Sequence, residues 1–128
     1  MKHMESVLLV FDDARELDFI GENLAENGFK VLRSVNLNDA FMLAEKTIPN
    51  LIVVNTVDSE LDFHAFSKKI KIETLKDVTL LSLIELEAYM KTSNTEHIVV
   101  KPVRPKLLLS LIRSVMNNEE INWLTCYH

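Results

Sequence analysis

The 128-residue chain has few of the residues on which several classes of protein depend. Its single cysteine, Cys126, excludes an internal disulfide framework and any multi-cysteine metal site. Two glycines are too few for a glycine-rich phosphate-binding loop of either common kind. No uninterrupted apolar run approaches the roughly 18 residues that a membrane span requires.

Basic residues are also in the minority, since 14 Lys and Arg stand against 19 Asp and Glu, for a net charge of −5. This balance argues against direct nucleic-acid binding, because neutralising phosphates requires a basic face. The first apolar run ends at Asp12, too early for a signal peptide. With 48% hydrophobic and 26% charged residues, the composition is that of an ordinary globular protein. We therefore expect one cytoplasmic domain with no membrane contact.

Short apolar runs alternate with stretches of helical periodicity about five times along the chain. The runs predict strands at 7–11, 29–32, 51–54, 78–81 and 98–100. Apolar residues at helical spacing predict helices around 17–24, 40–44 and 63–70, a weaker one over 84–92, and one from Pro105. Asn36 or Asn38 is expected to cap the second helix. Because no hairpin signal separates the strands, the pattern predicts an α/β fold with a parallel sheet covered by helices.

Polar residues directly follow four of the five apolar runs. They are Asp12 and Asp13, Asn55, Ser82, and Lys101. In an open parallel sheet, ligands bind beyond the carboxyl ends of the strands. We therefore expect two carboxylates, an amide, a hydroxyl and an ammonium group to converge on one crevice, as in a site for a small anion and a cation.

The order of these motifs resembles the receiver domain of two-component response regulators, from Ser6 to about Asn117. The resemblance is carried by Val-Leu-Leu-Val-Phe-Asp12-Asp13, Pro49-Asn50-Leu-Ile-Val-Val-Asn55, Leu81-Ser82, and Val-Val-Lys101-Pro102 leading into Pro105-Lys-Leu-Leu. It implies a flavodoxin-like (βα)5 doubly wound parallel sheet with strand order 2-1-3-4-5 in three α/β/α layers. The receiver-like domain would span 6–117. Residues 1–5 would be an added N-terminal extension, and 118–128 a tail or the start of a linker.

The resemblance assigns a metal and a phosphoryl role to one end of the sheet. The family's magnesium-binding acidic pair matches Asp12 and Asp13, and the backbone carbonyl that also contacts the metal matches Val57. Asn55 stands where the family has its phosphoacceptor aspartate. A neutral carboxamide is a very poor nucleophile and cannot form an acyl phosphate. The substitution also removes a negative charge on which Mg²⁺ depends, so we expect weak or absent Mg²⁺ binding and no other cofactor.

The remaining matches lie on the last two strands. Ser82 corresponds to the hydroxyl that contacts the phosphoryl group, Lys101 to the invariant lysine, and Pro102 to the residue of the usual cis peptide. Besides Asn55, the loop after it departs from the family's pattern at Ser59 and Phe63, which replace the usual proline and glycine, and these two strands depart from it at two positions. Leu83 replaces a small residue and should crowd the pocket, and Ile98 occupies the aromatic switch position.

These departures indicate a degenerate pseudo-receiver that is not an enzyme. We expect a signalling domain that is not phosphorylated at the usual site and acts as a protein-interaction module. The resemblance implies a kinase, an output domain or a second copy as partner. Contact would involve the face made by the fourth helix, the fifth strand and the last helix, with Tyr89, Met90, Ile98 and Leu109.

Other interpretations of the same residues stay open. The chain could be a metal-dependent phosphoacceptor that uses Ser82 or an acid near Asn55, such as Asp58, or a flavodoxin-like domain for a small ligand. Asp13 could serve only as a helix N-cap. Lys101 could be a structural counter-charge to the acidic pair, and Ser82 a satisfied buried hydroxyl.

Overall fold

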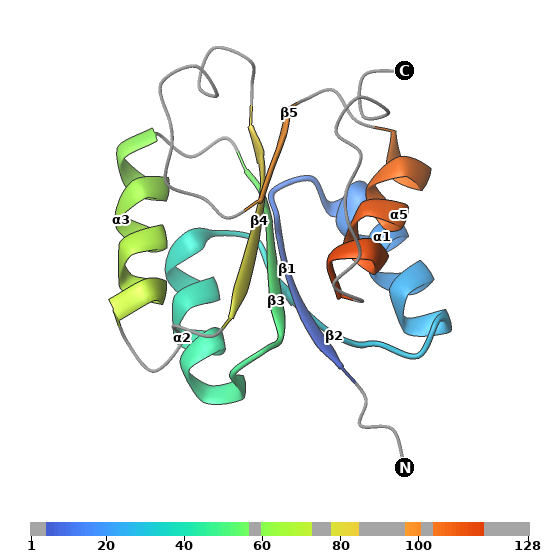
Figure 1. Ribbon diagram of the computed structural model, residues 1–128, viewed down its shortest axis with the longest axis horizontal. Helices are drawn as coiled ribbons and strands as arrows, with labels where there is room; N and C mark the ends of the chain where they lie inside the picture. The colour runs from blue at the N-terminus through green and yellow to red at the C-terminus, as the bar shows by residue number, and fades with distance from the viewer. Residues whose placement is uncertain (1–4, 57–59, 73–77, 85–96, 101–103, 117–128) are drawn as a thin grey trace.

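The computed structural model describes residues 5–56, 60–72, 78–84, 97–100 and 104–116 (Figure 1). For residues 60–63, 71–72, 82, 84 and 97–100 the description is that of the backbone. The helix predicted over 84–92 lies outside the described residues beyond Ile84, and so do both predicted terminal segments, apart from Glu5.

Five parallel strands form one sheet in the order β2-β1-β3-β4-β5. The strands are β1 (Ser6–Phe11), β2 (Lys30–Ser34), β3 (Leu51–Asn55), β4 (Thr79–Ile84) and β5 (His97–Val100). The predicted parallel topology and strand order are therefore confirmed. The central strands β1 and β3 are apolar over nearly their whole length, as expected of strands covered on both faces.

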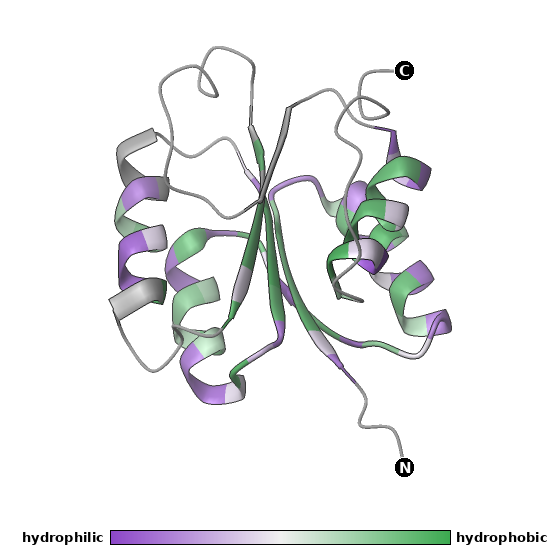
Figure 2. Ribbon diagram, in the orientation of Figure 1, coloured by the Kyte–Doolittle hydropathy of each residue, from purple (hydrophilic) through white to green (hydrophobic). Residues whose placement is uncertain are grey.

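Four described helices cover the sheet and produce the predicted three layers. They are α1 (Ala14–Glu26), α2 (Leu37–Thr47), α3 (Glu60–Ile72) and α5 (Pro105–Met116). Figure 1 shows α1 and α5 on one face of the sheet and α2 and α3 on the other. Figure 2 shows that apolar residues dominate β1 and β3, whereas the helices carry many polar residues on their outer sides.

Two apolar clusters lie on the two faces of the sheet because alternate side chains of a strand point in opposite directions. The first joins Val7, Leu9 and Phe11 of β1 to apolar residues of α1 and α5. The second joins Leu8 and Val10 to residues of α2 and α3. Strand β1 thus packs against both helical layers, as does β3, which contributes Leu51 and Val53 to the first cluster and Ile52 and Val54 to the second.

Strand β4 extends three residues beyond the predicted end at Leu81. The extension arises because Leu83 and Ile84 are apolar and pair with Val99 and Val100 of β5. Ser82 is therefore an internal residue of the strand rather than the residue that follows it. The sequence prediction was wrong on this boundary.

The cap of α2 is Asn36, whose side chain accepts a hydrogen bond from the backbone N–H of Asp39 at 2.8 Å. This bond satisfies one of the helix N-terminal N–H groups that have no partner within the helix. The structure thus decides between the two asparagines that the sequence left open.

Candidate functional site: the carboxyl end of β1 and β3

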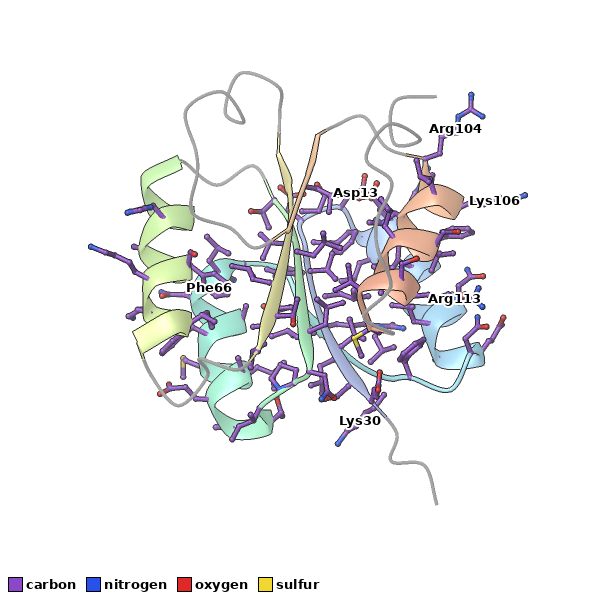
Figure 3. The ribbon with its side chains drawn as sticks, viewed as in Figure 1. Asp13, Lys30, Phe66, Arg104, Lys106 and Arg113 are labelled. Atoms are coloured by element: carbon purple, nitrogen blue, oxygen red, sulfur yellow. The ribbon has the colours of Figure 1, made fainter. Side chains whose placement is uncertain are left out.

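The first acidic residues follow β1 at the carboxyl end of the sheet. Asp12 and Asp13 are both exposed, and the backbone N–H of Asp12 donates to the carbonyl of Asn55 at 3.4 Å. Figure 3 shows Asp13 at the opposite end of the sheet from Lys30, which begins β2. The structure therefore brings the acidic pair and Asn55 to the same sheet end, as the sequence predicted.

Asp13 is the N-cap of α1. Its carboxylate Oδ1 accepts hydrogen bonds from the backbone N–H groups of Arg15, at 2.9 Å, and Glu16, at 3.2 Å. The residue has the extended backbone conformation that N-caps adopt, with φ −93° and ψ 112°. One oxygen of the acidic pair is thus engaged in starting a helix, which is the local role that the sequence allowed.

Asn55 is the last residue of β3 and lies opposite Phe11 of β1 in the sheet. Its half-buried side-chain amide donates a hydrogen bond from Nδ2 to the Glu16 carboxylate Oε1. The bond joins residues 39 positions apart and ties the end of β3 to the first turn of α1. An amide can make this bond, whereas a carboxylate in the same place has no proton to donate.

Glu16 is the residue that reasoning from the sequence missed. It lies three positions after the N-cap Asp13, a spacing typical of the glutamate in a capping box. That spacing could have drawn attention to Glu16 as a residue with a fixed position. It could not have shown that the carboxylate meets Asn55.

The described residues do not by themselves form a magnesium site. Among them, no group of three or more His, Cys, Asp or Glu residues is placed to hold a metal ion. Asp13 caps α1, Glu16 accepts from Asn55, and position 55 supplies no charge. Mg²⁺ prefers several oxygen ligands with carboxylate charge, so this arrangement is a poor one for it. Weak Mg²⁺ binding stays a prediction.

Comparisons with solved structures identify the fold. The regulatory domain of the repressor of iron transport regulator (RitR) superimposes with a TM-score of 0.79, at 17% identity over 92% of this chain and 99% of that chain. The receiver domain of a signal transduction histidine kinase from Syntrophus aciditrophicus gives 0.74, at 19% identity over 92% and 97%. Chemotaxis response regulator CheY4 of Vibrio cholerae gives 0.72, at 21% identity over 88% and 99%. The chain has the fold of a response regulator receiver domain.

Curated relatives of this receiver-fold chain are longer proteins. The "Probable transcriptional regulator ycf27" of Porphyra purpurea is 28% identical over 121 residues, which cover 91% of this chain and 49% of the relative. The protein of the same name from Porphyridium aerugineum is 24% identical over 115 residues, 88% of this chain and 48% of the relative. The chain thus spans about half the length of these relatives. No protein-family model matches it.

Other predicted site positions of the receiver fold lie on β4 and β5. Ser82 and Ile98 are paired across these two strands. Leu83 is only 3% exposed and belongs to the apolar cluster formed with α1 and α5. Its side chain is therefore part of the core, and its crowding of the pocket stays a prediction.

Several predicted positions lie outside the described residues, and their roles stay predictions. They are Val57, Asp58, Tyr89, Met90, Lys101 and Pro102. Within the described part of the chain, no helix is both long enough and apolar enough to cross a membrane.

A pocket of about 580 Å³ lies between α2 and α3, and its lining includes Asp39, Phe41, Phe66 and Lys69. The Lys69 ammonium stands 4.6 Å from the centre of the Phe41 ring, within cation–π distance. Neither the acidic pair nor Asn55 lines this pocket. The pocket therefore does not include these three residues, although part of its lining is the N-terminal turn of α2, which follows the carboxyl end of β2.

Proposed function

We propose that the chain is a receiver-like domain of two-component signalling that acts as a protein-interaction module without phosphorylation at position 55. The observation that carries the proposal is Asn55, a neutral amide at the end of β3 that is engaged by Glu16. A carboxamide cannot form the acyl phosphate through which an aspartate would transmit a signal. A phosphorylation switch at this position therefore has no nucleophile.

The acidic residues around Asn55 support the same proposal. Asp13 is engaged by the backbone of α1, and the Glu16 carboxylate by the amide of Asn55. Divalent cations that assist phosphoryl transfer need carboxylate oxygens directed at one point. Asp13 and Glu16 instead take part in the local structure of α1 and β3, which fits a domain that acts through its surface rather than as an enzyme.

The described part of the expected interaction face is basic. Arg104, Lys106 and Arg113 are exposed on or beside α5, and Figure 3 shows Arg104 and Lys106 pointing away from the sheet. Between Arg104 and Met116 the sequence holds no acidic residue, although the whole chain carries −5. Leu109 is only partly buried and packs against the core. This surface suits an acidic protein partner, either a kinase, an output domain or a second copy.

The longer relatives favour an output domain among these partners. They are named transcriptional regulators, and the chain matches about half of their length. A receiver-like domain without its own phosphoacceptor can still position an output domain through contacts. Any DNA binding would then belong to that other domain, since the present chain is acidic overall.

The proposal is tested by incubating the chain with acetyl phosphate and MgCl₂ and measuring its intact mass. We expect no gain of the about 80 Da that one phosphoryl group adds. An active receiver domain treated in parallel shows that the donor works. A gain by the wild-type chain would refute the proposal, and peptide mapping would then show whether Ser82, Asp58 or another residue had accepted the group.

A further inference from the structure

We propose that Glu16 is a positioning residue that selects an amide at position 55 and keeps the end of β3 unsuited to acyl phosphate formation. The hydrogen-bonded pair of Glu16 and Asn55 is called the clasp below. This inference deepens the proposed function and rests on it, since it explains how the domain is held in its unphosphorylated form.

Both members of the clasp are placed by regular structure. Glu16 lies in the first turn of α1, which the Asp13 side chain caps. Asn55 ends β3, which pairs with β1 through Phe11, and its carbonyl accepts from the N–H of Asp12. Groups held by helices and strands keep a contact more accurately than groups held by loops. Regular secondary structure therefore positions the backbones from which the two side chains meet.

The chemistry of the clasp depends on which partner carries the proton. The Asn55 amide donates and the Glu16 carboxyl group accepts, and a hydrogen bond to an ionised carboxylate is stronger than one between neutral groups. A carboxylate at position 55 would place two acceptors and two negative charges against each other in a half-buried setting. Glu16 therefore fits asparagine at position 55 and opposes aspartate.

Glu16 also affects the approach of a phosphoryl donor. A phosphoryl group carries negative charge, and the Glu16 carboxylate lies in hydrogen-bonding contact with the side chain that the group would have to reach. Like charges repel most strongly where water is partly excluded. Glu16 thus acts against phosphorylation in addition to the missing nucleophile.

A double-mutant cycle with Asn55→Asp, Glu16→Gln and the double variant tests the clasp. Asn55→Asp alone should raise the unfolding equilibrium constant about tenfold, the size expected for two contacting groups that have become incompatible. In the Glu16→Gln background the same change should raise it no more than about threefold, because the glutamine amide can donate to the new carboxylate. Glu22→Gln, at an exposed position of the same helix, controls for loss of charge.

Two further measurements separate positioning from general stability. In NMR spectra, the side-chain NH₂ signals of Asn55 should shift in Glu16→Gln and stay in place in Glu22→Gln. With acetyl phosphate and MgCl₂, the double variant should gain more phosphate than Asn55→Asp alone. Both readouts concern position 55 itself, so a merely destabilised helix would not reproduce them.

The outcomes distinguish this inference from the proposed function. The clasp is overturned if Asn55→Asp lowers the free energy of unfolding equally in both backgrounds and the Asn55 amide signals do not shift in Glu16→Gln. That result leaves the proposed function standing if the wild-type chain gains no phosphate from acetyl phosphate. If the wild-type chain gains phosphate, the proposed function fails, whatever the double-mutant cycle shows. Coupling in the cycle together with an inert wild-type chain supports both.

Discussion

Replacing Asp13 separates the structural role of its carboxylate from any role of its charge. The side chain accepts hydrogen bonds from two backbone N–H groups, at 2.9 and 3.2 Å, and these N–H groups would otherwise have no partner within α1. Asp13→Ala removes the capping oxygen, at a cost of about 1 kcal/mol. It also removes a negative charge from the helix N-terminus, worth about 0.5 kcal/mol at an exposed site. The free energy of unfolding should therefore fall by about 1.5 kcal/mol.

Asp13→Asn is the matched control for this change. Asparagine caps helices as well as aspartate does, so only the charge term of about 0.5 kcal/mol should be lost. Urea unfolding followed by circular dichroism measures both variants. At a slope of about 1.5 kcal/mol per molar urea, the midpoint should fall by about 1 M for alanine and by about 0.3 M for asparagine.

The Asp13 experiment also bears on the clasp, because Glu16 belongs to the turn that Asp13 caps. Asp13→Ala should loosen that turn and shift the side-chain NH₂ signals of Asn55, whereas Asp13→Asn should leave them nearly unchanged. Equal losses of stability in the two variants would refute this reasoning. They would mean that the carboxylate matters through its charge at the sheet end and not through its bonds to α1.

Two further predictions concern the framework that holds the site. Ile48, the C-cap of α2, is 56% exposed and has a left-handed backbone conformation with φ 46°. Ile48→Gly should raise the urea midpoint, because it relieves about 1 kcal/mol of backbone strain. A lower midpoint would contradict this prediction. Leu83→Ala should cost about 2–4 kcal/mol, because the side chain is buried in the core, whereas Leu83→Met should cost under about 1.5 kcal/mol. If Leu83→Ala unfolds in urea as the wild type does, the assignment of Leu83 to the core is wrong.

The strand order and layers could be predicted from the sequence because their signals are local and repeated. Runs such as Val7–Phe11 and Leu51–Val54 are apolar on both faces, and only a covered parallel sheet buries them. The motifs at their ends then resemble one family in a fixed order. The position of Asn55 at the end of β3 followed from the same run.

The parts that could not be predicted depend on partners distant in sequence. Strand β4 ends later than predicted because Leu83 and Ile84 pair with β5, and the apolar run alone does not reveal that pairing. The burial of Leu83 in the core depends on which face of the strand it occupies in that register. The bond from Asn55 to Glu16 requires the first turn of α1 to meet the end of β3, which only the folded chain shows.

The clasp changes how the asparagine at position 55 is interpreted. If the Asn55 side chain had no partner, replacing it with aspartate would leave the stability of the domain unchanged. Here the amide has a partner, so the same replacement breaks a hydrogen bond and opposes two charges. On this proposal, efficient phosphorylation at position 55 requires at least two changes, one at position 55 and one at Glu16. On this proposal, Asn55→Asp alone lowers stability and gains less phosphate than the double variant with Glu16→Gln.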